Sequence, residues 1–177
     1  MPIDQSVLRQ KAFSYDRRLH EGLRTSASVG TMRRAFLCHS HQDEALVQGL
    51  TVIFREAGID LYIDWQDHSM PETPNTETAQ RIQHKIKECD IFLFLATANS
   101  KASRWCPWEI GYADSSQKRI YVIPTLEGAA SYGNEYLDLY KSIDAASSPN
   151  GKIGYALFSR GQTDAEWISN ESLRSHR

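Results

Sequence analysis

The sequence predicts an α/β domain built on one parallel sheet with helices on both faces. Four short apolar runs have the length and composition of buried strands: 34–38, 59–64, 91–96 and 119–125. Segments with helical periodicity separate these runs. Because parallel strands need a long crossover between them, such strand–helix alternation is typical of a parallel sheet that helices cover on both sides.

Length and composition restrict the class of protein. The chain has 177 residues, 41% hydrophobic and 24% charged, with a formal net charge of -2. These values suit one globular domain and argue against a nucleic-acid or acidic-lipid surface. The scattered cysteines Cys38, Cys89 and Cys106 lack CxxC spacing and are expected to be reduced thiols. No apolar stretch has the length of a membrane span and no signal peptide is recognised, so we expect a cytoplasmic protein without membrane contact.

The first predicted unit is strand, helix, strand. Ser40, with Asp43 three residues later, resembles a capping box that would start a helix after the strand at 34–38. Gly58 is a natural stop for this helix before the strand at 59–64. The apolar stripe expected to be buried consists of Leu46, Leu50, Ile53, Phe54 and Ala57.

A polar loop at 65–75 follows, and a connection of this length is more often functional than structural. The next helix carries Ala79, Ile82 and Ile86. Beyond the strand at 119–125 the pattern weakens, and it predicts a helix at 136–143, a fifth strand at 155–159 and a helix at 164–173. The preferred topology is therefore a flavodoxin-like three-layer sandwich with a five-stranded parallel sheet.

Residues 1–33 are predicted to form a separate extension. Leu8, Ala12, Tyr15, Leu19 and Leu23 recur at helical spacing before a linker of small residues, which indicates an amphipathic helix. Its apolar stripe would lie either on its own domain or on another copy of the chain. The expected division is 1–33 for this extension, 34–160 for the α/β domain, and 161–177 for a C-terminal helix or tail.

The segment from Ser100 to Asp114 is the strongest candidate for a site. It follows the buried strand at 91–96, and ligands of open α/β sheets bind where strands end. Its helix is expected to begin near Cys106 or Pro107, or earlier with Ser103 as the cap. Glu109 then lies in or near the first turn, where the helix dipole favours an ionised carboxylate at neutral pH. An ordinary glutamate stabilised by the dipole is the alternative interpretation.

Other chemistries lack the residues that they need. His39 and His41 are two residues apart without a set of further ligands, so a metal site is not expected. The sequence has no phosphate-binding glycine loop and no nucleophile elbow. A phosphate-receiver domain would need an aspartate after the third strand, where this chain has Ala96, Thr97 and Ala98.

Four pieces of sequence together resemble a bacterial TIR (Toll/interleukin-1 receptor-like) domain. They are Phe36-Leu-Cys-His-Ser-His-Gln-Asp43, Gly58-Ile-Asp-Leu-Tyr-Ile-Asp64, Ile91-Phe-Leu-Phe-Leu, and Ser103-Arg-Trp-Cys-Pro-Trp-Glu-Ile-Gly-Tyr-Ala113. The resemblance covers about residues 34 to 127 and includes the family's Trp-x-x-x-Glu pattern as Trp105 and Glu109. Two departures are Cys38 in place of the commoner serine and a loop after Asp64 without the usual glycine.

The resemblance implies an enzyme that cleaves NAD+ between nicotinamide and ribose, with NAD+ as substrate and no separate cofactor. It implies that Glu109 is the catalytic glutamate and that Trp105, His39, Ser40 and Asp64 bind substrate. The product would be ADP-ribose or a cyclic or conjugated form of it. The implied setting is antiphage defence, with a separate effector protein that senses the nucleotide.

The resemblance also implies self-association through TIR–TIR contacts, and it leaves two other functions open. One is a TIR module used only for assembly. The other is an enzyme similar to the nucleoside deoxyribosyltransferases, whose glutamate forms a covalent bond to the sugar.

Overall fold

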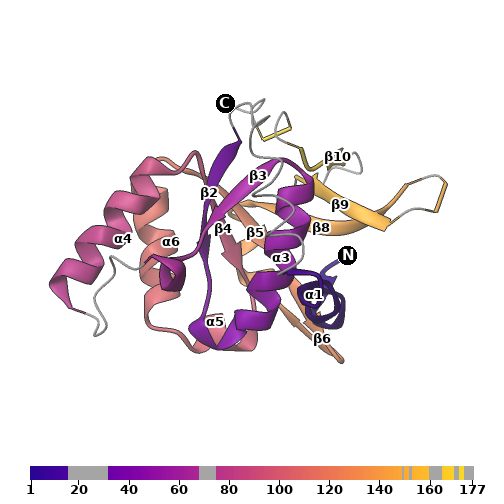
Figure 1. Cartoon of the computed structure of the whole chain (residues 1–177), viewed down its shortest axis with the longest axis horizontal. Coiled ribbons are helices and arrows are strands. Elements are labelled where there is room, and N and C mark those ends of the chain that lie inside the picture. The colour runs from indigo at the N-terminus through magenta and orange to yellow at the C-terminus, as the bar shows by residue number, and fades with distance from the viewer. Residues whose placement is uncertain are drawn as a thin grey trace.

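Among the described residues, seven strands form the middle layer of the molecule (Figure 1). This computed structural model describes residues 1–15, 32–67, 75–148, 150–151, 153–159, 165–169 and 172–173. The strand order is β10-β9-β8-β5-β4-β2-β3. The strands are β2 (Arg33–Cys38), β3 (Ile59–Tyr62), β4 (Ile91–Leu95), β5 (Arg119–Ile123), β8 (Lys141–Ser147), β9 (Ile153–Phe158) and β10 (Glu166–Trp167).

Five neighbouring strands of this described sheet, β3-β2-β4-β5-β8, run parallel. Numbered along the chain, their order is 2-1-3-4-5, which is the flavodoxin-like order that the sequence predicts. However, β9 and β10 join the β8 edge as antiparallel strands. The expected five-stranded, purely parallel sheet is therefore wrong, because the sheet is mixed and larger.

The secondary structure predicted from the sequence is wrong mainly in the last third of the chain. The helix expected at 136–143 is instead a short 3-10 turn, η4 (Asn134–Tyr136), followed by β8, which supplies the fifth parallel strand. The strand expected at 155–159 exists as β9, but it pairs with β8 as a hairpin. The helix expected at 164–173 is wrong at Glu166–Trp167, which pair with β9. Pairing with neighbouring strands decides these conformations, and local sequence does not encode it.

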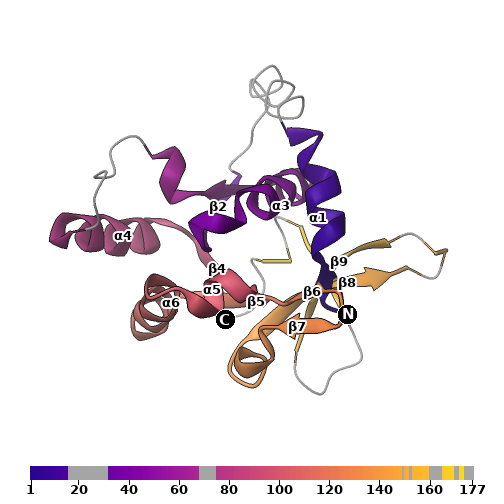
Figure 2. The same cartoon turned by 90° about the horizontal axis from the view of Figure 1, so that it is seen from below.

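Helices cover both faces of the sheet (Figure 2). The apolar cluster on one face includes residues of α1 (Gln5–Ala12) and α3 (Glu44–Glu56), and the other includes residues of α4 (Thr76–Glu88) and α6 (Trp105–Ser115). Successive side chains of a strand point to opposite faces of the sheet. Along β2, Leu37 therefore lies in the first cluster, whereas Phe36 and Cys38 lie in the second. The shorter helical elements are η2 (His41–Asp43), η3 (Asp64–Gln66) and α5 (Ala98–Ala102).

The first fifteen residues pack on the domain itself. β1 (Ile3–Asp4) runs parallel to β6 (Thr125–Glu127), which pairs with β7 (Ala130–Tyr132) in a small second sheet. Asp4 caps α1, and Leu8 of α1 is fully buried in the cluster with α3. The described part of the predicted amphipathic helix therefore covers its own domain, while Leu19, Leu23 and the predicted linker lie outside the described residues.

Gly49 allows α1 to approach α3 closely, and replacing it with alanine is expected to destabilise the fold. A Cβ atom at position 49 would lie 2.1 Å from the carbonyl oxygen of Leu8, so α1 would have to move away. Overpacking of this kind costs about 1–3 kcal/mol. Urea unfolding of Gly49→Ala measures the change in free energy of unfolding.

Gly111→Ala is the matched control, because Gly111 is also helical but has no atom within 4 Å of an added Cβ. Alanine should stabilise that helix by about 0.5–1 kcal/mol. Equal stability of wild type and Gly49→Ala would contradict the close packing of α1 on α3.

Candidate active site

The candidate residues after the first two parallel strands meet at one edge of the sheet. His39 directly follows β2, and Asp64 follows the neighbouring strand β3 by two residues. Parallel strands place their carboxyl ends at the same edge, so the two side chains lie together. His39 Nε2 is 3.4 Å from Asp64 Oδ1.

His39 is a buried histidine with one nitrogen unpaired. Its Nδ1 lies 2.7 Å from the carbonyl oxygen of Leu37, so Nδ1 carries the proton and donates it. Nε2 is then an acceptor in the neutral ring, and it has no hydrogen-bond partner among the described residues. The His39 side chain is 2% exposed, and this burial lowers the pKa of the imidazole.

Asp64 also binds two groups to which the sequence analysis assigned no role. Its Oδ2 accepts a hydrogen bond from Nε2 of His41 at 2.8 Å, and its Oδ1 accepts one from the backbone N–H of Trp65 at 2.8 Å. The Trp65 ring stands edge-on to His39, with centroids 4.5 Å apart. Burial acts to raise the pKa of Asp64, but the His41 hydrogen bond and both imidazoles together lower it.

The predicted capping box of Ser40 and Asp43 is only half present. The Ser40 hydroxyl oxygen accepts a hydrogen bond from the backbone N–H of Gln42 at 3.4 Å, which caps η2. Asp43 is buried, and its carboxylate instead accepts bonds of 2.6 Å from the Thr97 hydroxyl and from the Asn99 amide. Asp43 thus ties the segment after β2 to the segment after β4.

Helix α6 presents Glu109 on its buried face. The helix begins at Trp105, where the Ser103 hydroxyl oxygen accepts hydrogen bonds from the N–H groups of Trp105 and Cys106 at 3.1 and 3.3 Å. This start lies one residue before the predicted start near Cys106. The N-cap is Arg104, so the alternative with Ser103 as the N-cap is wrong, although the Ser103 hydroxyl group contacts the first turn. The buried residues of this helix are Cys106, Glu109, Ile110 and Ala113, and Cys106, Ile110 and Ala113 belong to the second apolar cluster.

The Glu109 carboxyl group differs in charge from the expectation. It is 6% exposed, and burial is the largest cause that raises its pKa to about 8. The Cys106 and Asp64 charges act in the same direction, whereas a hydrogen bond with the Cys38 thiol and the His41 charge oppose the shift. The predicted ionised state at neutral pH is therefore wrong. Glu109 is the fifth residue of α6, where the dipole has weakened and burial outweighs it.

Trp105 lies at the start of the same helix and is half-buried against the second apolar cluster. Its ring meets Trp108 edge-on with centroids 5.5 Å apart, and Trp108 stacks on Tyr112 at 6.0 Å. These three aromatic rings form a row along α6 that leads from the Glu109 turn toward the end of the helix.

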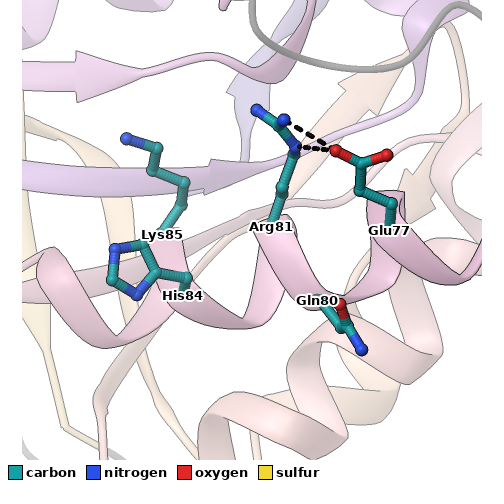
Figure 3. A pocket seen from close by; sticks show the side chains of 5 residues that line it. All are labelled: Glu77, Gln80, Arg81, His84 and Lys85. Atoms are coloured by element: carbon teal, nitrogen blue, oxygen red, sulfur yellow. Dashed lines mark hydrogen bonds and ion pairs between the residues drawn. The ribbon is translucent and has the colours of Figure 1, made fainter.

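The hollow in Figure 3 belongs to a different part of the molecule. All five residues that line it come from α4, and an ion pair of 2.7 Å joins Arg81 to Glu77 there. It contains none of the candidate residues.

The described residues include no group of three or more His, Cys, Asp or Glu side chains placed to hold a metal ion. No helix within the described ranges is long and apolar enough to span a membrane.

Comparison with known proteins identifies relatives of the chain. The curated protein named probable 3' cyclic ADP-D-ribose synthase ThsB' from Bacillus cereus is 34% identical over 113 residues, covering 61% of this chain and 58% of that protein. The putative cyclic ADP-D-ribose synthase TIR2 from Cytobacillus dafuensis is 25% identical over 91 residues, covering 50% and 24%. The chain thus spans less than two thirds of the length of either relative.

One solved structure is also similar, the Clostridium botulinum CMP N-glycosidase BcmB. It shares 23% identity and has a TM-score of 0.40, with 51% of this chain and 67% of that chain covered. The family model for the TIR domain matches residues 35–156, which contain His39, Asp64, Trp105 and Glu109. This match covers more than half of the sequence and all of the five parallel strands except the first two residues of β2, and the chain belongs to the TIR domain family.

Proposed function

We propose that this protein cleaves NAD+ at the bond between nicotinamide and ribose, with Glu109 as the catalytic carboxylate. The observation that carries the proposal is the buried carboxyl group of Glu109 on α6, beside the ends of β2 and β3, in a chain of the TIR family. Further support comes from the relative at 34% identity, which is named a probable cyclic ADP-D-ribose synthase.

The chemistry suits a single buried carboxylate. Nicotinamide leaves as a neutral molecule, so no general acid is needed. Positive charge then develops on the ribose in an oxocarbenium-like transition state, as in glycoside hydrolysis. A carboxylate held beside that ring stabilises the developing charge, and the low exposure of Glu109 strengthens this interaction because little water screens it.

Binding of NAD+ would also restore the charge on Glu109. The nicotinamide ring of NAD+ is a cation, and a cation beside a carboxyl group lowers its pKa. The raised Glu109 pKa of about 8 would therefore fall when the substrate binds. Substrate binding and ionisation of the catalytic group would then favour each other.

The other candidate residues would position the nucleotide. His39 and Asp64 offer hydrogen-bond acceptors at the sheet edge for hydroxyl groups, and Ser40 follows His39 in the chain as the N-cap of η2. Trp105 would offer the face of its ring to nicotinamide or ribose, since the ring packs only partly against the second apolar cluster.

The product would be ADP-ribose or a cyclic or conjugated ADP-ribose that acts as a signal in antiphage defence. A separate effector protein would detect it. Purified protein incubated with NAD+ tests the proposal, with nicotinamide and nucleotide products separated by chromatography. Release of nicotinamide is expected, and its absence at high protein concentration, with and without lysate of infected cells, would favour the assembly module that the sequence left open.

Self-association through TIR–TIR contacts is expected to raise activity. Trp65, directly after Asp64, stands edge-on to His39 at the candidate site, and we expect a surface of a second subunit to complete the site on this side. Specific activity should therefore increase with protein concentration in parallel with the mass measured by light scattering. Constant specific activity of a monomer over a wide dilution range would show that one chain holds the whole site.

A further inference from the structure

Two histidines share one carboxylate at the candidate site. His41 Nε2 lies 2.8 Å from Asp64 Oδ2, and His39 Nε2 lies 3.4 Å from Asp64 Oδ1. The two imidazole rings are near neighbours, with centroids 6.0 Å apart. Two imidazolium ions at this distance repel each other, so a proton on one ring disfavours a proton on the other, although the Asp64 carboxylate attracts a proton to either ring.

The geometry decides which ring is charged. The His41 side chain is 70% exposed and its hydrogen bond to Asp64 is short, so water and the carboxylate both stabilise its cation. The His39 side chain is 2% exposed, and its longer approach to Asp64 does not form a hydrogen bond. Within the part of the chain that the structure describes, the one hydrogen-bond partner of the His39 ring is the Leu37 carbonyl oxygen, which binds the proton on Nδ1 and is satisfied by a neutral ring.

We propose that His41 is a positioning residue: by binding Asp64 as a cation it keeps the buried His39 ring neutral, with Nε2 available to accept a hydrogen bond from the substrate. Asp64 transmits the effect because it contacts both rings. The sequence offered no role for His41 beyond a loop position, and its link to Asp64 crosses 23 residues of chain.

The surrounding charges agree with this assignment. For His39, burial is the largest cause of a lowered pKa and the charge of His41 adds to it, while Asp64, Asp43 and the Leu37 carbonyl oppose it. For His41, the hydrogen bond with Asp64 is the largest cause of a raised pKa. Glu109 and Cys106 raise the pKa of His41 further, against the effect of partial burial.

The consequence for function rests on the proposed cleavage of NAD+. An unpaired acceptor inside a protein is unfavourable, and a hydroxyl group of the substrate would satisfy it. Protonated His39 would carry N–H groups on both nitrogens and could no longer accept. The charge on His41 would thus favour the binding of sugar hydroxyl groups, which can donate a hydrogen bond to His39 Nε2.

Titration of the histidine ring protons by NMR tests the proposal without any substrate. In the wild-type protein, His39 should remain neutral at lower pH than an ordinary histidine and His41 should stay charged at higher pH. In His41→Gln the amide can still donate to Asp64 but carries no charge. The His39 midpoint should then rise by about one pH unit, and it should rise further in His41→Ala.

His84→Gln is the matched control. His84 is 69% exposed and lies 3.0 Å from the Glu88 carboxylate on α4, so it is an equivalent pair away from the site. This variant should leave the His39 titration unchanged, and His39→Gln identifies the His39 signal. A His39 midpoint that does not move in either His41 variant, or a wild-type protein in which His39 is the charged ring, would overturn the proposal.

Kinetics extend the test to the substrate. At pH 6.5 the KM for NAD+ should rise several-fold in both His41 variants, whereas at pH 9 it should match the wild type because His39 is then neutral in every protein. A KM defect of equal size at both pH values would indicate a purely structural role and count against the proposal. If wild-type protein does not cleave NAD+, the proposed function fails, and the NMR titration still decides how the two histidines share the proton.

Discussion

Glu109→Gln is expected to abolish NAD+ cleavage while the protein remains folded. Glutamine has nearly the same shape but cannot carry the negative charge that would stabilise the ribose cation. The loss should be on the order of a thousandfold or more, comparable with removing a main electrostatic group from an active site. Nicotinamide release, followed by chromatography at matched protein concentration, measures it.

The same substitution should raise stability in alkaline solution. The folded-state pKa of about 8 exceeds the ordinary glutamate value of 4.5, so the folded protein binds this proton more tightly than the unfolded chain. Ionisation therefore opposes folding: wild-type stability is fully present below pH 4.5 and falls as the pH rises toward 8. Glutamine does not ionise, so Glu109→Gln should exceed wild type at pH 9 by at most several kcal/mol, on the order of magnitude of such shifts.

Urea unfolding at pH 5 and pH 9 measures this difference. Glu77→Gln serves as a control, because Glu77 is an exposed carboxylate on α4 and the substitution should change stability little at either pH. Turnover that survives in Glu109→Gln would remove Glu109 from the catalytic role. A variant that is inactive and also unfolded would show that Glu109 is needed for folding, contrary to the proposal.

The first four parallel strands could be predicted from the sequence because each is a short apolar run with no competing pattern. The run at 91–95 is buried at every position, as expected for a strand covered on both faces. The strand at 141–147 was missed because it contains Lys141, Ser142 and Asp144 among small residues, which gives no clear periodicity. Its pairing with β5 and β9 fixes the conformation.

For the candidate site, the sequence placed Glu109 on the correct helix but assigned it the wrong charge. The helix dipole is a local property that position in the chain reveals, whereas the burial of Glu109 by the end of β2 depends on the packed fold. Asp43 illustrates the same limit, since its partners Thr97 and Asn99 are more than fifty residues away. The local sequence pattern predicted that Asp43 takes part in a capping box with Ser40, but in the structure its hydrogen bonds to Thr97 and Asn99 replace that interaction.

The rate of NAD+ cleavage is expected to rise steeply with pH. The proposed mechanism needs the Glu109 carboxylate, and burial raises the pKa of this group to about 8. Because kcat/KM reports the ionisation of the free enzyme, it should increase tenfold per pH unit below about 8 and level off above. At pH 6 it should be about a hundredfold below the plateau.

The pH dependence of kcat should differ, because it reports the enzyme with NAD+ bound. The cationic nicotinamide ring lowers the pKa of a neighbouring carboxyl group, so the rise in kcat should occur at lower pH than the rise in kcat/KM. Initial rates from pH 5.5 to 9.5, corrected for NAD+ breakdown without enzyme, measure both quantities. A kcat/KM that is flat between pH 6 and 9 would mean that Glu109 is already ionised in the free enzyme. A kcat/KM that falls as the pH rises above 8 would mean that the enzyme is active with Glu109 protonated. The proposed mechanism, which needs the ionised carboxylate, would then be wrong.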